Sequence, residues 1–416
     1  MSQVKPQSEQ EEMKIENPLE KKIETFKNII QDCNISFLIG SGLSVPFMGT
    51  LGGIETWLTG LEENKEISTE LKQYIKASLY KSYFDVAMKD NVEILDFIYN
   101  ENERVCPDCE RPSKLIQTYE AYKDFLRIIN QVLYERRSNT VNKQVNLFTT
   151  NIDVFFEKII EDLDLQFNDG FNGVFRKQFH LSNFKKSFYQ KSLHYDNIAE
   201  IPVFNLLKIH GSVTWKLDNT NIEFAGLDVL KNVINAAGTS DLIDIVSLSN
   251  KKWDDAKTNL TIEEIIEEAT TKDPIPSTAE FIEAYEKLQV VNPTKDKFRD
   301  TTFNKTYYEM LRLYANELEK ENSVLFVMGF SMADEHIRDI TFRAIKSNPT
   351  LKVFICSYTE QAKDIKRNLQ NDRIDLKDFH NVELLNPTDE FDLQKMNKLL
   401  FNPLLESILL RKNFEK

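Results

Sequence analysis

The sequence predicts an α/β fold with a doubly wound, mostly parallel sheet, helices on both faces and large, mainly helical insertions. Five short apolar segments support this prediction, and each ends in a turn or helical pattern. They are residues 35–39, 145–153, 203–215, 323–328 and 351–360. Nearly uninterrupted apolar strands that alternate with helices are typical of a parallel sheet buried on both faces. The pattern therefore predicts a layered α/β domain.

The segments between the strands are mostly helical in pattern. Residues 21–32 place Ile23, Phe26 and Ile29 on one helical face. Residues 54–137 have helical spacing and are rich in aromatic side chains. Further helices are expected at residues 154–163, 307–323 and 335–345, and after the last predicted strand.

The same pattern predicts one large domain over residues 18–385. We expect a disordered tail at residues 1–17 and a helical segment at residues 386–416. Insertions are expected at about 54–140, 165–202 and 216–305. The C-terminal helix is apolar on one side, so it either packs on its own domain or contacts a partner or a second copy.

Composition excludes several classes of protein. The 416 residues include 41% hydrophobic residues and 28 Phe, enough for a large core rather than a disordered chain. No apolar run reaches the ~18 residues of a membrane span, and the N-terminus lacks the apolar stretch of a secretory signal. Four cysteines do not make a disulfide framework, so we expect a reducing, cytoplasmic environment. The net charge of −14 argues against broad direct binding of nucleic acid.

Small residues follow the first predicted strand in the motif Gly40-Ser41-Gly42-Leu43-Ser44. They let the backbone approach a phosphate, which the amides at a helix start can hold. The third glycine of a dinucleotide fingerprint and the lysine of a P-loop are both missing, which disfavours ATP chemistry. An ordinary strand-to-helix turn explains these residues equally well.

Polar residues follow the second strand in the motif Thr149-Thr150-Asn151-Ile152-Asp153. Ligands of open α/β sheets lie beyond the carboxyl ends of the strands. These side chains are therefore candidates for positioning a ribose, an amide or a water. The alternative is that Thr150 or Asn151 caps the helix that starts near Val154.

The third strand carries His210 and Gly211. A neutral histidine can take a proton from a ribose hydroxyl near pH 7, and a glycine allows a ligand to approach. The alternative is a histidine bonded to nearby backbone.

The fourth motif runs from Met328 to His336. Gly329 and Ser331 are candidates for holding a phosphate. Asp334 and Glu335 suit the start of a helix electrostatically, and we interpret His336 as structural.

In order and spacing, the four motifs resemble those of the sirtuin family over about residues 35–357. The resemblance implies a doubly wound, Rossmann-like NAD-binding domain in which Asn151 helps to place the ribose and a water. It also implies that Asp153 holds the nicotinamide amide and that His210 is the general base. The residues assigned to NAD binding are Gly40, Ser41, Gly42, Ser44, Thr149, Thr150, Ile152, Gly211, Gly329, Ser331 and Ser357.

The sequence departs from the deacetylases of that family. They carry Gly-Ile-Pro-Asp-Phe-Arg after the first motif and a zinc module with two Cys pairs after the His-Gly motif. Here a single pair, Cys106 and Cys109, precedes Asn151. Cys33 and Cys356 fall in or beside predicted core elements, so we expect no metal site. GSGLSVP, Trp57, TTNID, IHGSVTW and GFSMADEHI are more similar to the sirtuin-like domains of bacterial anti-phage defence proteins.

That similarity implies an NAD glycohydrolase that cleaves NAD, its substrate, to nicotinamide and ADP-ribose. It implies the effector of an abortive-infection (antiviral) system in a bacterial cytoplasm. It further implies a homo-oligomer that works with a HerA-like hexameric ATPase. The alternatives are an NAD-dependent protein deacylase, a non-catalytic NAD or ADP-ribose sensor, and a nuclease subunit, although no clear nuclease metal motif is present.

Overall fold

The computed structural model describes residues 18–50, 53–97, 110–137, 141–219, 221–248, 260–292, 301–371 and 374–414. The predicted tail at residues 1–17 and the pair Cys106 and Cys109 lie outside the described residues. Within the described ranges, no helix is both long and apolar enough to cross a membrane.

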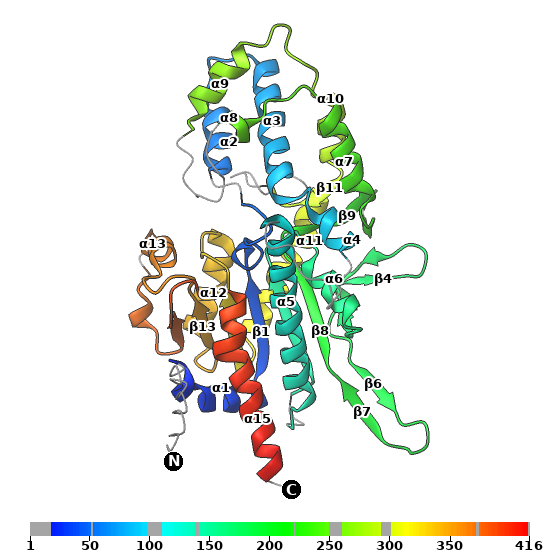
Figure 1. The fold of residues 1–416 in the computed structure, drawn as a ribbon, viewed down its shortest axis with the longest axis vertical. Coiled ribbons are helices and arrows are strands. Elements are labelled where there is room, and N and C mark those ends of the chain that lie inside the picture. Colours follow the sequence, from blue (N-terminus) through cyan, green and yellow to red (C-terminus); the bar gives the residue numbers. More distant parts are fainter. Residues whose placement is uncertain are drawn as a thin grey trace, which may run out of the picture.

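A seven-stranded, all-parallel sheet forms the centre of the molecule (Figure 1). Its strands, from one edge to the other, are β14 (Val382–Leu385), β13 (Lys352–Cys356), β12 (Ser323–Met328), β1 (Asn34–Ile39), β2 (Gln144–Thr149), β8 (Val203–Lys208) and β3 (Phe167–Asn168). Every residue of β2, β8 and β12 is buried. This confirms the predicted doubly wound α/β fold, because continuous apolar strands need cover on both faces.

Helices cover both faces of the sheet. The core residues Phe37 and Leu38, adjacent in β1, belong to separate hydrophobic clusters, as expected when side chains alternate across a strand. One cluster includes side chains of α1 (Glu20–Asp32), α5 (Glu110–Tyr134), α6 (Phe155–Asp162) and α15 (Asn402–Phe414). The other includes side chains of α11 (Thr301–Leu318), α12 (Glu335–Ser347) and α13 (Lys363–Asn371).

The strand order places a topological switch point between β1 and β12. The chain runs from β1 to β2 and β8 on one side, then returns to form β12 on the other side of β1. Backbone connections therefore leave the carboxyl ends of β1 and β12 in opposite directions. Such a point is where open α/β sheets bind their ligands.

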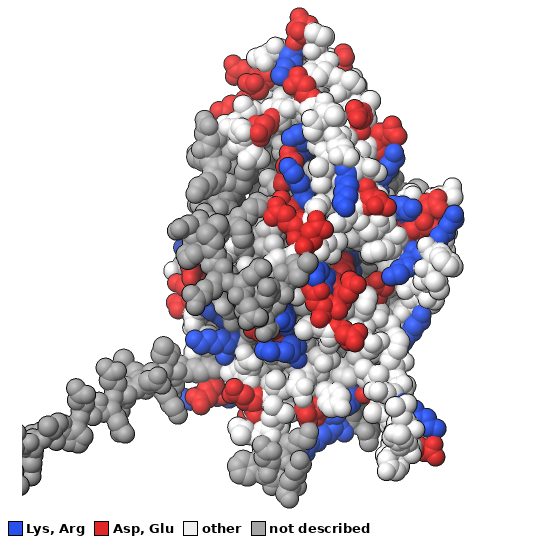
Figure 2. Space-filling model, turned by 45° about the vertical axis from the view of Figure 1, so that its right-hand side comes forward, with Lys and Arg blue, Asp and Glu red and all other residues white. Residues whose placement is uncertain are grey.

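Two insertions that are far apart in sequence form one helical module, at the top of Figure 1. The ring of Tyr80 stacks on that of Tyr285 at 5.0 Å, and Trp57 Nε1 donates to the Leu260 carbonyl over 2.9 Å. Acidic side chains are spread over this module (Figure 2). Its helices are α2 (Ile54–Glu63), α3 (Thr69–Ala87), α7 (Asp228–Thr239), α8 (Ile245–Leu248), α9 (Ile262–Thr270) and α10 (Ala279–Tyr285). The short helix α4 (Asn91–Asp96) lies below the module (Figure 1), where Asn91 Oδ1 accepts from the Val154 amide over 3.0 Å.

Two segments differ from the prediction. Helix α5 falls within the predicted insertion 54–140 but packs against the central sheet, because Phe125 meets Phe37 of β1 at 5.1 Å. The predicted insertion 165–202, whose sequence has no clear period, forms short strands, so not every insertion is helical. These are β3, β4 (Phe171–Asn172), β5 (Gln178–Phe179), β6 (Phe188–Lys191) and β7 (Ile198–Ile201), with the short helix η2 (Leu181–Asn183).

The predicted strand at residues 203–215 is two strands. β8 ends at Lys208, and β9 (Gly211–Asp218) starts a second, antiparallel sheet in the order β11-β9-β10-β5-β4. Strands β10 (Asn221–Phe224) and β11 (Leu288–Val290) flank β9. Gly211 has a φ of +79°, which favours glycine and allows the chain to change direction. His210 therefore lies in a turn between two sheets.

The C-terminal segment packs on its own domain. Helix α14 (Leu393–Met396) leads through a π-helical stretch (Asn397–Phe401) into α15. The ring of Phe401 lies 5.3 Å from that of Phe125, and Asn397 Nδ2 donates to the Ala121 carbonyl over 2.8 Å. The apolar side of this segment therefore contributes to the core, which is the first of the two predicted alternatives.

Candidate active site at the carboxyl edge of the central sheet

The loops after β1 and β12 lie in close contact at the switch point. The amide of Gly40 donates to the Met328 carbonyl over 3.0 Å, and that of Gly42 to the Gly329 carbonyl over 2.9 Å. A Cβ atom on Gly40 would lie 2.5 Å from the Gly329 oxygen. Both glycines are therefore required by this close packing, whether or not a ligand binds. Ser41 and Gly42 are the exposed residues of the turn.

Ser44 is the centre of a buried hydrogen-bond network. Its hydroxyl donates to Oδ2 of Asp153 over 2.8 Å, and Nδ2 of Asn151 donates to Ser44 Oγ over 3.2 Å. The phenol oxygen of Tyr122, on α5, lies 2.8 Å from the same hydroxyl. The structure thus brings three predicted site residues together with Tyr122, which the sequence analysis missed.

Asp153 uses both carboxylate oxygens inside the protein. Oδ2 accepts from Ser44, and Oδ1 accepts from the Phe155 amide at the start of α6 over 3.2 Å. Burial raises the pKa of Asp153, while the positive charge of Lys208 and the Ser44 hydrogen bond oppose that rise. The helix start is thus held by Asp153 rather than by Thr150 or Asn151, the two predicted caps.

The residues before Asp153 fix the position of Asn151. The Thr149 hydroxyl donates to the Ile39 carbonyl over 3.1 Å, and it accepts from the Asn151 amide over 2.9 Å. The Thr150 amide also donates to Ile39 over 3.0 Å, and Ile152 is buried. The motif is therefore attached to the end of β1 by its threonines.

Asn151 retains one unused acceptor. Asn151 is 5% exposed, and its side-chain oxygen Oδ1 is buried without a hydrogen-bond partner among the described residues. A buried acceptor of this kind costs free energy unless a water or ligand group donates to it. Oδ1 of Asn151 can therefore hold a water or a hydroxyl.

His210 and Asp334 meet above the sheet edge. Nε2 of His210 lies 3.4 Å from Oδ2 of Asp334, and these side chains are 17% and 7% exposed. Oδ1 of Asp334 accepts from the Ile337 amide over 3.1 Å, so Asp334 caps α12 as its charge predicted. The ring of Tyr307 lies 6.1 Å from that of His210. The contact between His210 and Asp334 has no signal in the sequence.

No protein-family model and no curated protein matches the chain.

The remaining predicted residues lie at two neighbouring strand ends. Gly329 has a φ of +61°, and the Ser331 residue is exposed, with its carbonyl accepting from Asn368 Nδ2 over 2.8 Å. Ser357 is buried, and its hydroxyl donates to the Thr359 carbonyl over 2.9 Å. Of the two hydroxyls, that of Ser357 bonds within its own loop, whereas Ser331 faces solvent.

A buried lysine, also missed, lies beneath the Ser44 network. Lys208, the last residue of β8, is 3% exposed, and its ammonium donates to Oε1 of Glu157 over 2.8 Å and to the Asp153 carbonyl. Burial raises the pKa of Glu157, and Lys208 opposes this effect. The cation thus compensates the buried carboxylate of Asp153 and the partly buried one of Glu157, whose side chain is 21% exposed.

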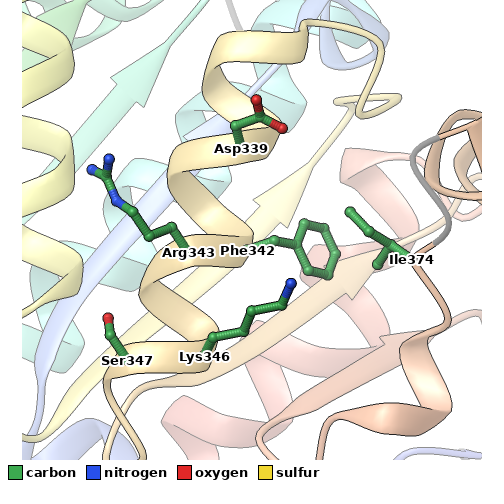
Figure 3. A pocket seen from close by; sticks show the side chains of 6 residues that line it. All are labelled: Asp339, Phe342, Arg343, Lys346, Ser347 and Ile374. Carbon is green, nitrogen blue, oxygen red and sulfur yellow. The ribbon is translucent and has the colours of Figure 1, made fainter.

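Two open hollows flank α12. One, of about 560 Å³, is lined by five residues of α12 and by Ile374; Phe342, Lys346 and Ile374 point toward one another there (Figure 3). The other, of about 750 Å³, lies between α11 and α12 and includes Tyr308 and Arg343. Neither includes a residue predicted for the site.

Proposed function

We propose that this chain is an NAD glycohydrolase, which cleaves NAD to nicotinamide and ADP-ribose. The observation that carries the proposal is the grouping of Ser44, Asn151 and Asp153 in one network at the switch point of a parallel sheet. His210 lies in the turn that follows β8, at the same edge of the sheet. The order of the four motifs supports the same assignment.

The proposed reaction uses water as the acceptor. The glycosidic C–N bond breaks with its electron pair passing to the nicotinamide nitrogen, and a water oxygen bonds to the ribose carbon. Oδ1 of Asn151 is the acceptor that can hold this water or a ribose hydroxyl. His210 takes the released proton and returns it to solvent. Positioning of the water and general-base catalysis are both large contributions to rate.

The phosphates and the adenosine are assigned to the other strand ends. We assign the pyrophosphate to the exposed side of the Gly40–Ser44 turn, at Ser41 and Gly42. Ser331 follows β12 and Ser357 follows β13, so the adenosine would extend in that direction.

Strand pairing favours hydrolysis over deacylation. Deacetylating sirtuins pair an acyl peptide with an extended strand after the His-Gly motif. Here β9 follows that motif, and it pairs with β11 on one side and β10 on the other. A peptide would have to displace one of these strands to add to β9, whereas water needs no such edge.

We also propose that the enzyme is the effector of an anti-phage abortive-infection system, as a homo-oligomer gated by a HerA-like ATPase. An exposed β-hairpin supports the existence of a docking surface. This arm, residues 188–201, contains β6 and β7 and projects from the body (Figure 1). Leu193 is 95% exposed and Tyr195 73% exposed, so the arm presents large apolar side chains that a docked partner would cover.

The test is release of nicotinamide from NAD by the wild-type chain and by Asn151→Ala, alone and with the ATPase. We expect turnover by the wild type in at least one mixture and a loss of about 100-fold in the variant. Saturable NAD binding without turnover in every mixture would replace the hydrolase with a non-catalytic NAD sensor.

A further inference from the structure

The contact between His210 and Asp334 spans the sheet edge. His210 follows β8 and Asp334 follows β12. In the sheet, the strands β1 and β2 lie between β8 and β12. At about 4.8 Å per strand, the two strand ends are roughly 14 Å apart. The loops must therefore fold over the ends of β1 and β2, which carry the Ser44 network, to bring Nε2 within 3.4 Å of Oδ2.

The loop that presents Asp334 is held in one conformation. Met332, two residues earlier, is fully buried and has a φ of +60°, a backbone conformation that costs free energy for a side-chain-bearing residue. Nη1 of the buried Arg338 donates to the Met332 carbonyl over 2.7 Å. The carboxylate of Asp334 is therefore positioned by the fold and by the cap of α12.

We propose that Asp334 is a positioning residue that orients His210 and fixes its tautomer, a role that rests on the proposed hydrolase function. Nε2–H of His210 faces Oδ2 of Asp334, so Nδ1 is left as the proton acceptor. The separation of 3.4 Å is longer than a hydrogen bond, and such contacts tighten when substrate binds. A carboxylate that orients a catalytic imidazole in this way acts through geometry and tautomer rather than by taking the proton itself.

The two oxygens of Asp334 have separable roles, which makes the proposal testable. Oδ1 caps α12 through the Ile337 amide. In Asp334→Asn the amide oxygen keeps this cap, since asparagine is as good a cap as aspartate. The amide nitrogen then takes the place of Oδ2 and donates to Nε2, which favours the opposite tautomer.

The first measurement is of the tautomer and does not depend on activity. The chain has five histidines, so ¹⁵N-histidine labelling gives few signals, and His210→Ala assigns the relevant one. We expect Nε2–H in the wild type at pH 8 and a shift toward Nδ1–H in Asp334→Asn. A wild-type Nδ1–H tautomer, or the same tautomer in both proteins, would overturn the proposal even if no NAD turnover is found.

The second measurement is a double-mutant cycle on NAD hydrolysis. We expect Asp334→Asn to lower kcat by about 10- to 1,000-fold with KM changed less than about threefold. The loss should add nothing to His210→Ala. The matched control is Asp392→Asn, since Asp392 caps α14 through the Lys395 amide over 2.8 Å, and kcat should not change. Multiplicative losses in the double variant would show that Asp334 acts independently of His210.

Discussion

Replacing Ser44 with alanine removes the hydroxyl at the centre of the site and leaves its three partners in place. That hydroxyl has one proton, which goes to Asp153 over 2.8 Å, so the phenol of Tyr122 donates to it over 2.8 Å. Asn151 donates to the same oxygen over 3.2 Å. The variant therefore deprives two donors and one acceptor of a partner inside the core.

The cost follows from these contacts. A buried polar group that loses its partner costs about 1–3 kcal/mol, and local relaxation recovers part of this. We expect Ser44→Ala to lower the free energy of unfolding by about 2–4 kcal/mol. At about 2.1 cal/mol/K of unfolding entropy per residue, the 416-residue chain loses roughly 1 °C per kcal/mol. The expected fall in Tm is therefore about 2–5 °C.

The cost also depends on pH. Burial raises the pKa of Asp153, and the Ser44 hydrogen bond opposes that rise, so Ser44→Ala should raise this pKa further. When a carboxyl has a higher pKa in the folded protein than in the unfolded chain, the protein loses stability as the pH rises from the unfolded-state pKa to the folded-state pKa. The difference in Tm between wild type and Ser44→Ala should therefore be larger at pH 8 than at pH 5.

The matched control is Ser78→Ala in the helical module. The Ser78 hydroxyl is also fully buried, donates to the Tyr74 carbonyl over 3.0 Å and accepts from the Ile243 amide over 3.1 Å. Both variants should lose stability in thermal unfolding, but only Ser44→Ala should lose NAD turnover, by at least about tenfold. Equal turnover in the two variants, or an unchanged Tm in Ser44→Ala, would refute the reasoning.

Three further predictions follow from the fold. Gly40→Ala should lower the free energy of unfolding by about 1–3 kcal/mol, because its Cβ would lie 2.5 Å from the Gly329 backbone oxygen. The control Gly238→Ala should not destabilise the protein, because a Cβ there would have no atom within 4 Å. Equal Tm values for the two variants in thermal unfolding would contradict this prediction. Burial raises the pKa of Cys356 to about 12, so iodoacetamide should label it only after unfolding, and labelling of the native protein, seen by mass spectrometry, would be the contrary result. Changing both Leu193 and Tyr195 of the arm to serine should lower the mass in analytical ultracentrifugation without lowering Tm, and an unchanged mass would exclude the arm from assembly.

The strands and their polar ends were predictable because they are local patterns. The apolar run of β2 and the polar residues after it occur in one short segment, and parallel strands bring all such ends to one edge. This reasoning places Ser44, Asn151 and Asp153 at that edge. It does not show that Ser44 hydrogen-bonds the other two.

The rest depends on contacts between distant segments. Tyr122 reaches Ser44 only because α5 packs on the central sheet. The sequence of α5 has the same helical, aromatic-rich pattern as the insertion that precedes it, so the pattern alone does not separate the two. The continuous apolar pattern through His210 hides the turn between β8 and β9, which a glycine with positive φ makes possible. The sequence predicts that Asp334 caps a helix. Only the fold shows that its other carboxylate oxygen, Oδ2, faces His210.

The most direct test of the account is nicotinamide release from NAD by the wild type, His210→Ala and the exposed control His180→Ala, alone and with the ATPase. The account predicts turnover by the wild type and by His180→Ala, and a loss of at least about 100-fold in His210→Ala. Full turnover by folded His210→Ala would contradict the assignment of the base. No turnover by the wild type in any mixture would contradict the proposed function.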